Sequence, residues 1–145
     1  MNEDIIKKIR QFNRYYTIWL DVMGKGYLGT GFSWSESRVL FEIYSNQGIN
    51  AAELCGHLNI DKSYVSRLLA KFEEKGVITR KLVPGSKGVK KIYLTDLGKE
   101  EARRIDRNGD KQISAKLSNL EEEDCGRLCE AMALIEEILS KNDKE

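Results

Sequence analysis

The chain has 145 residues, of which 41% are hydrophobic and 32% charged, and its formal net charge at pH 7 is +1. This size fits one globular domain with a modest core, and a single proline among long periodic segments predicts a mainly helical protein. No apolar stretch is long enough for a membrane span and the amphipathic start MNEDIIKKIRQF is not a signal peptide, so we expect a cytoplasmic protein with no membrane partner.

Residues 4 to 23 are predicted to form an amphipathic helix. Apolar residues recur there at steps of three and four: Ile5, Ile9, Phe12, Tyr16, Trp19 and Met23, with Ile6, Tyr15 and Leu20 beside them. A face this wide needs more than one surface to cover it.

A glycine-rich stretch follows, in which Gly24, Gly26 and Gly29 match the spacing GxGxxG. A dinucleotide site of that pattern needs a strand before the glycines and a helix that opens at them. Here a helix precedes the glycines and the next helix opens later, so we interpret residues 24 to 31 as a flexible connection.

A second helix is predicted from Ser33 to about Ser45. Ser33 and Glu36 have the capping-box spacing of a helix start. The side chains expected to face inward are Val39, Leu40, Ile43 and Tyr44. This helix should support the two shorter helices that follow.

Residues 50 to 76 are predicted to be two short helices joined by a tight turn. Asn50 and Asp61 are suited to cap the two helices, and Asn59 suits a left-handed position in the turn. In the second short helix an apolar stripe is formed by Val65, Leu68, Leu69 and Phe72. The side chains near its N-terminus and off this stripe are Lys62, Ser63, Ser66 and Arg67, and such short polar and basic groups suit a helix that reads base edges in the major groove.

A β-hairpin is predicted next, because residues 77 to 83 and 92 to 94 alternate around a loop with Pro84, Gly85 and Gly88. The predicted fold class is therefore mainly α with a small β-hairpin wing, a winged helix-turn-helix over about residues 33 to 95. Residues 61 to 91 hold nine basic and three acidic residues, a net charge of +6 that leaves −5 for the remainder. Such concentrated charge is typical of a surface that binds phosphates.

Two more helices are predicted after the wing, one from Thr95 to about Leu117 and one that follows the acidic run at Glu121. The last helix carries a narrow apolar seam: Cys125, Leu128, Met132, Ile135 and Leu139. Because both ends of the chain carry apolar surface that the small central part cannot cover, we expect a homodimer. The whole chain, 1–145, is then a single domain with dimerisation helices at about 4–23 and 96–140.

The three cysteines, Cys55, Cys125 and Cys129, do not suggest a disulfide framework. Cys125 and Cys129 share a helix face, but structural zinc uses a second close pair of ligands, so no metal site is predicted. No nucleophile, base and orienting acid fall together, and we expect neither catalytic residues nor a cofactor.

The sequence resembles the MarR family of transcription regulators across nearly its whole length. The segments that carry the resemblance are SESRVLFEI (35–43), AAELCGHLNIDKSYVSRLLAKFEEKGVITR (51–80) and IYLTDLGKE (92–100). YLGTGFSWSESRVLFEI and IDKSYVSRLL are most similar to the regulator portion of proteins in which a MarR domain is fused to a GNAT acetyltransferase, although no acetyltransferase follows here.

The resemblance implies a homodimer with intertwined terminal helices that reads a roughly palindromic operator in double-stranded DNA. It implies DNA contacts by Lys62, Ser63, Ser66 and Arg67. The family's wing usually carries an Asp-x-Arg pattern whose Arg enters the minor groove, and these positions are Ser86 and Gly88 here. The wing contacts are therefore expected from Lys87, Lys90 and Lys91, with less planar hydrogen bonding than Arg provides.

The resemblance also implies a small aromatic or lipophilic effector that changes DNA affinity. Aromatic walls and one cation suit an aromatic carboxylate, and the candidates are Tyr16, Trp19, Trp34 and Arg38. Core packing explains Tyr16 and Trp19 equally well. A winged-helix module that binds proteins without specific DNA binding is the alternative function, since the usual wing arginine is missing.

Overall fold

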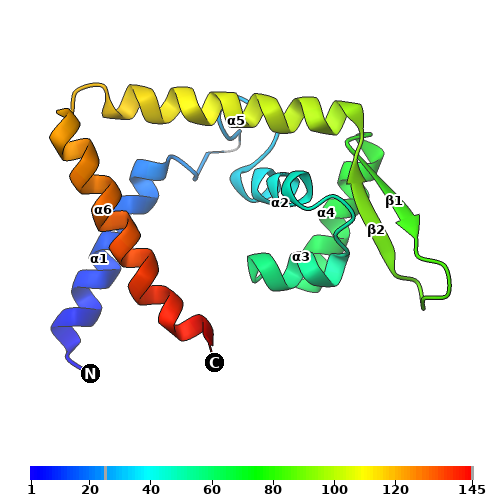
Figure 1. Cartoon of the computed structure of the whole chain (residues 1–145), viewed down its shortest axis with the longest axis horizontal. Helices are drawn as coiled ribbons and strands as arrows, with labels where there is room; N and C mark the ends of the chain where they lie inside the picture. The colour runs from blue at the N-terminus through cyan, green and yellow to red at the C-terminus, as the bar shows by residue number, and fades with distance from the viewer. Residues whose placement is uncertain (25, 145) are drawn as a thin grey trace. The chain divides into compact units, whose positions relative to one another are not determined.

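The computed structural model describes residues 1–24 and 26–144; Lys25, in the predicted glycine-rich connection, and Glu145 lie outside the described residues. The elements follow one another in the order α1 (Glu3–Leu20), α2 (Trp34–Ser45), α3 (Ala51–Leu58), α4 (Lys62–Glu74), β1 (Ile78–Leu82), β2 (Lys90–Leu94), α5 (Asp96–Leu117), α6 (Glu122–Leu139) and the 3-10 helix η1 (Ser140–Lys144) (Figure 1). The predicted fold class, mostly helical with one antiparallel hairpin as a wing, is confirmed. Among the described residues, no helix combines the length and the apolar character needed to cross a membrane.

The chain divides into two compact units, Met1–Asn108 and Gly109–Glu145, and α5 runs through the boundary between them. In the first unit, α2, α3, α4 and the hairpin share one core. Its buried apolar side chains include Phe32, Val39, Leu40, Ile43, Leu54, Val65, Leu69, Phe72, Val77, Ile78 and Ile92. Tyr44, predicted to face inward, is 39% exposed, because the core covers the side of this turn that carries Ile43.

Local side-chain caps set the helix ends in this unit. The N–H of Glu36 donates to Ser33 Oγ, and the N–H of Ser33 donates back to Glu36 Oε1 at 3.0 Å, so the predicted capping box is present. Asn59 adopts the predicted left-handed conformation with φ of 50°. Helix α1 ends at Leu20, three residues before the predicted end, because Asp21 is also left-handed, with φ of 55° and ψ of 48°.

The hairpin is anchored at its base. Ile78 pairs with Leu94 and Arg80 with Ile92 across the two antiparallel strands. The N–H of Leu94 also donates to the side chain of Gln47 at 2.9 Å, which ties β2 to the loop after α2. The tip, residues 83 to 89, therefore extends from a fixed base.

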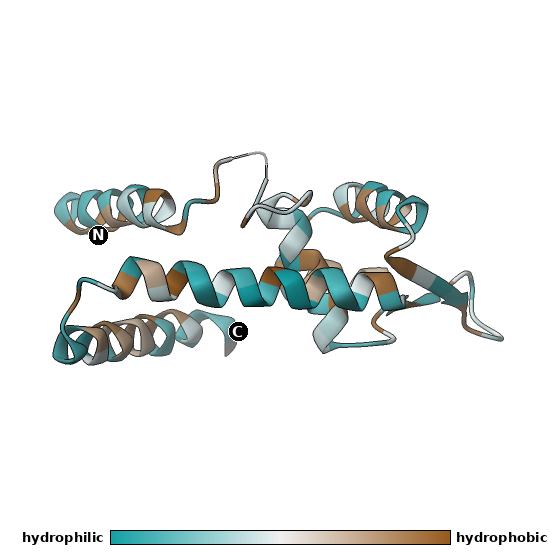
Figure 2. Ribbon diagram, turned by 90° about the horizontal axis from the view of Figure 1, so that it is seen from above, coloured by the Kyte–Doolittle hydropathy of each residue, from teal (hydrophilic) through white to brown (hydrophobic). Residues whose placement is uncertain are grey.

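Among the described residues, most apolar side chains of the first and last helices are exposed. Helix α1 has no buried residue, and its exposed apolar side chains include Ile5, Ile6, Ile9, Phe12, Tyr15 and Ile18. In the second unit, Cys125, Leu128 and Met132 are half-buried along α6. The large apolar side chains further along α6 are exposed, namely Leu134, Ile135, Ile138 and Leu139, and hydrophobic residues recur along this helix in Figure 2.

Candidate nucleic-acid interface

Helix α4 separates a buried side from an exposed polar side near its N-terminus. Asp61 caps the helix by accepting the N–H of Tyr64 at 3.3 Å. The buried side consists of Val65, Leu68, Leu69 and Phe72. The four predicted DNA-contacting side chains are all exposed: Lys62, Ser63, Ser66 and Arg67. The geometry thus presents these groups together to solvent.

Two contacts from α2 hold α4 in place. The hydroxyl groups of Ser35 and Tyr64 are hydrogen-bonded at 2.9 Å. Further along α4, Lys71 Nζ lies 2.8 Å from Glu36 Oε2, and the Glu36 side chain is only 10% exposed. Burial by itself raises the pKa of Glu36, but hydrogen bonds from Lys71 and Ser33, with the charge of Lys71, outweigh it and hold the pKa below the ordinary value of 4.5.

Acidification is therefore expected to weaken the attachment of α4 to α2. Because the pKa of Glu36 is lower in the folded state than in the unfolded state, its contribution to stability is present above the unfolded pKa and is lost as the pH falls through the folded pKa. We expect the unfolding free energy of the parent to fall more steeply than that of Glu36→Gln between about pH 6 and about pH 3, measured by urea denaturation. Glutamine keeps the capping-box spacing, and Lys71→Met should reproduce the flatter profile. Identical profiles for parent and both variants would contradict this role.

Several basic residues of the 61–91 segment interact with other side chains of the protein. Arg80 donates from Nε to Glu73 Oε2 at 2.9 Å and from a second nitrogen to the other oxygen at 3.3 Å. The hydrogen bond and charge of Arg80, with a smaller contribution from Lys90, hold the pKa of Glu73 below 4.5. Arg80 is thus committed to fixing the wing against the end of α4.

Lys75 and Lys81 lie over aromatic rings, Lys75 Nζ at 4.9 Å from the centre of Phe32 and Lys81 Nζ at 5.3 Å from that of Tyr93. With Lys71 and Arg80, these are four of the nine basic residues of the segment. Within the part of the chain that the structure describes, the other five make no ion pair, side-chain hydrogen bond or ring contact: Lys62, Arg67, Lys87, Lys90 and Lys91. All five are exposed, and all belong to the predicted set of DNA-contacting residues.

The wing tip is shaped by Ser86 and two glycines. Ser86 Oγ donates to the Val83 carbonyl at 2.6 Å and accepts the N–H of Val89 at 3.2 Å, so it closes the loop. Gly85 and Gly88 have φ of 78° and 81°, values that residues with a Cβ rarely adopt. The resemblance predicts the family's wing arginine at the position of Gly88, and the φ of 81° there suits glycine and is unfavourable for arginine.

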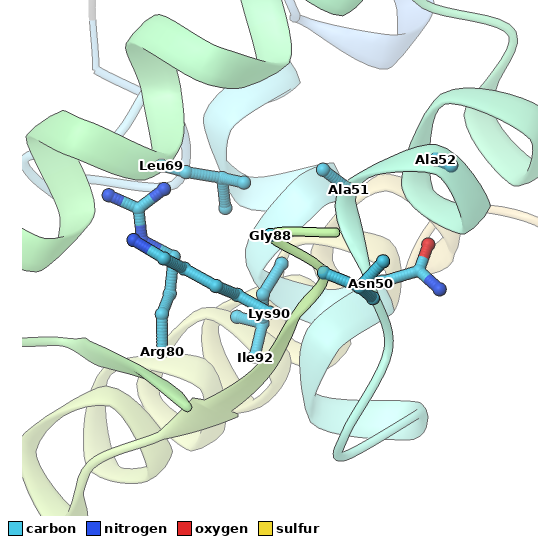
Figure 3. A pocket seen from close by; sticks show the side chains of 9 residues that line it. Asn50, Ala51, Ala52, Leu69, Arg80, Gly88, Lys90 and Ile92 are labelled. Atoms are coloured by element: carbon cyan, nitrogen blue, oxygen red, sulfur yellow. The ribbon is translucent and has the colours of Figure 1, made fainter. Parts of the chain in front are cut away.

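A cavity of about 370 Å³ separates the wing from the start of α3 (Figure 3). It is lined by Asn50, Ala51, Ala52, Leu69, Arg80, Gly88, Val89, Lys90 and Ile92. Arg80 and Lys90 extend to the same side of it in Figure 3. A second cavity, of about 340 Å³, lies between the start of α2 and α4 and is lined by Ser33, Glu36, Tyr64, Arg67, Leu68 and Lys71.

The predicted effector residues form two separate pairs. Tyr16 and Trp19 stack on α1 with ring centres 5.6 Å apart. Trp34 and Arg38 lie one turn apart on α2, where Trp34 is 39% exposed and Arg38 lies 3.8 Å from Glu42. The two cavities above are lined by other residues, so the effector site stays a prediction.

Sequence reasoning misses the groups that position the interface. It assigns Glu36 only to a helix cap and gives Tyr64 and Arg80 no role. The contacts of Ser35 and Glu36 with α4 leave no periodic pattern in the sequence, because they depend on how α2 and α4 pack. The ion pair of Arg80 could have been suspected from the sequence, because an acidic residue stands at the end of the preceding helix.

The comparisons with known proteins find similarity to transcription regulators. Residues 30–87 match the MarR family model. The uncharacterized HTH-type transcriptional regulator YdgJ of Bacillus subtilis (strain 168) is 28% identical over 104 residues, which are 72% of this chain and 63% of that protein. The chain spans less than two thirds of the length of the curated relatives that it matches.

Solved structures share the fold. Staphylococcus aureus MarR in complex with salicylate and kanamycin has a TM-score of 0.76 and 21% identity, with 94% of each chain covered. Streptococcus pneumoniae FabT in complex with DNA has a TM-score of 0.72 and 16% identity, with 96% of this chain and 97% of that one covered. The chain is thus similar to the MarR family over residues 30–87 and shares the fold of solved MarR regulators.

Proposed function

We propose that the chain is a DNA-binding transcription regulator that acts as a homodimer on a roughly palindromic operator in the cytoplasm, without enzymatic activity. The observation that carries this proposal is the set of five exposed basic side chains on α4 and the wing, for which the described residues provide no ion pair or hydrogen bond. Arginine and lysine in this state are available for phosphates and base edges. The resemblance of residues 27–43 and 60–69 to the regulator part of MarR/GNAT fusions supports a relationship to that subgroup.

Each group has a separate role in this proposal. Ser63, Ser66 and Arg67 read base edges in the major groove, and Lys62 contacts a phosphate near the N-terminus of α4. Lys87, Lys90 and Lys91 contact phosphates from the wing. Because the wing has glycine in place of the family's arginine, it adds affinity more than sequence preference.

The proposal is tested by fluorescence anisotropy on DNA from upstream of the protein's own gene and on scrambled DNA, over a series of salt concentrations. We expect tight, operator-selective binding that weakens steeply with salt. Changing Lys87, Lys90 and Lys91 to alanine should weaken binding to both DNAs alike and reduce the slope of log K against log salt by about one unit for each phosphate that is no longer neutralised.

The matched control changes Lys7, Lys111 and Lys141 to alanine, which removes the same charge from exposed positions outside the basic segment. This control should keep the parent's slope. Equal weak binding of the parent to operator and scrambled DNA would reject the proposal and favour a protein-interaction module.

Dimerisation is proposed to use the exposed apolar faces of α1 and α6. Leu139 is 61% exposed on α6, and replacing it by glutamate places a charge in the proposed interface. We expect the dimer dissociation constant, measured by sedimentation velocity, to rise by about 100-fold or more, because each homodimer loses two leucines from apolar contacts. Leu82→Glu is the control, since Leu82 is also 61% exposed but lies on the wing. Equal effects of the two changes would exclude α6 from the interface.

We also propose a small aromatic or lipophilic effector, bound by Tyr16, Trp19, Trp34 and Arg38. An effector shifts DNA affinity only if it binds one arrangement of the dimer better than another. The exposed indole of Trp34 supports an aromatic ligand. Salicylate is a suitable probe, and its binding should quench tryptophan fluorescence less in Trp34→Leu than in the parent.

A further inference from the structure

We propose that Cys125 and Cys129 form a two-thiolate site for one Cu(I) ion within a single chain. Both thiols are free and lie on α6 one turn apart, so their Cβ atoms are about 5–6 Å from each other on one helix face. Cys125 is half-buried and Cys129 is exposed. Within one chain, the second thiol is therefore the more accessible of the two.

The geometry disfavours the two commoner uses of such a pair. An intrachain disulfide needs Cβ atoms about 3.5–4.5 Å apart, which an intact helical turn does not allow. Zinc prefers four ligands. Across residues 1–24 and 26–144, no group of three or more His, Cys, Asp and Glu side chains could hold a metal ion.

A soft metal ion that can be coordinated by two thiolates suits Cys125 and Cys129. Cu(I) prefers sulfur ligands, and the carboxylates of the neighbouring acidic turn, Glu122, Glu123 and Asp124, are hard ligands that compete poorly for it. Asp124 is moreover paired with Arg127 at 3.1 Å. On binding, each thiol loses its proton and one S–Cu bond forms at each sulfur, with no change in oxidation state.

The site is independent of the proposed DNA contacts, because it belongs to the unit Gly109–Glu145 while those contacts come from residues 62 to 91. Metal binding can therefore be measured whether or not the chain binds an operator. The third thiol, Cys55, packs against the core of the first unit and serves as an internal control.

The test is an anaerobic titration of the reduced full chain with Cu(I) in competition with a chromophoric Cu(I) chelator. We expect one ion per chain, release of two protons per ion, and a loss of affinity of about 100-fold or more in both Cys125→Ser and Cys129→Ser. Cys55→Ser should bind like the parent. Cys125→Ala, checked by circular dichroism, separates loss of the ligand from loss of the fold.

The proposal is overturned if either serine variant keeps the parent's affinity, or if Cys55→Ser loses it. One ion per two chains would show a bridge between protomers and would equally reject a site within one chain.

Discussion

Replacing Ser63, Ser66 and Arg67 together by alanine is expected to abolish selective operator binding and leave the fold intact. All three side chains are exposed, and Arg67 makes no ion pair or side-chain hydrogen bond within the described chain, so their removal costs little packing. A good bidentate contact with a base contributes about 1–3 kcal/mol of discrimination, and the serines add weaker contacts. Arg67→Ala alone should weaken operator binding by about 10- to 100-fold. Anisotropy with operator and scrambled DNA measures both affinity and selectivity.

The control for charge is Arg103→Ala, on the exposed surface of α5 with its nitrogen 3.9 Å from Glu100. It removes one positive charge from outside the basic segment and should leave operator selectivity unchanged. If the triple variant bound operator with the parent's affinity and selectivity, α4 would not be the reading helix, and the five exposed basic residues would have another purpose.

Local chemistry makes much of the fold predictable. The capping box of Ser33 and Glu36, the cap at Asp61 and the left-handed Asn59 depend on residues within three or four positions of one another. The spacing of these residues in the sequence is therefore enough to predict the caps. The end of α1 is harder to predict, because the helix ends at Asp21 in a left-handed conformation. Glycine is the usual residue in that conformation, and Asp is a weaker indication of a helix end.

Whether a basic side chain has a partner within the protein is not predictable in the same way. Lys62 and Arg67 look like Lys71 and Lys75 in sequence, yet Lys71 pairs with Glu36 and Lys75 lies over Phe32. Both partners come from the region before α3, more than thirty positions earlier. Only packing distinguishes a charge that fixes the fold from one that is available to a ligand.

The start of α5 gives the second prediction: Gly98→Ala is expected to destabilise the protein by about 3 kcal/mol, the upper part of the range for overpacking. A Cβ at this position would overlap the carbonyl oxygen of Val77 and lie 3.0 Å from its carbon and 3.3 Å from Leu94 Cβ. The residues around Gly98 cannot move away easily. Val77 and Leu94 are buried, and the hydroxyl of Thr95, which accepts the N–H of Gly98, donates to the carbonyl of Gly76 at 2.6 Å.

Gly126→Ala is the matched control, since it makes the same change inside α6, where no atom lies within 4 Å of the added Cβ. Helix propensity alone would make both changes stabilising by about 0.5–1 kcal/mol. We therefore expect opposite signs in urea denaturation at one protein concentration, a fall for Gly98→Ala and a small rise for Gly126→Ala. A rise in both would mean that α5 can move away from Val77 at little cost. The wing and α4 would then not be fixed to the start of α5.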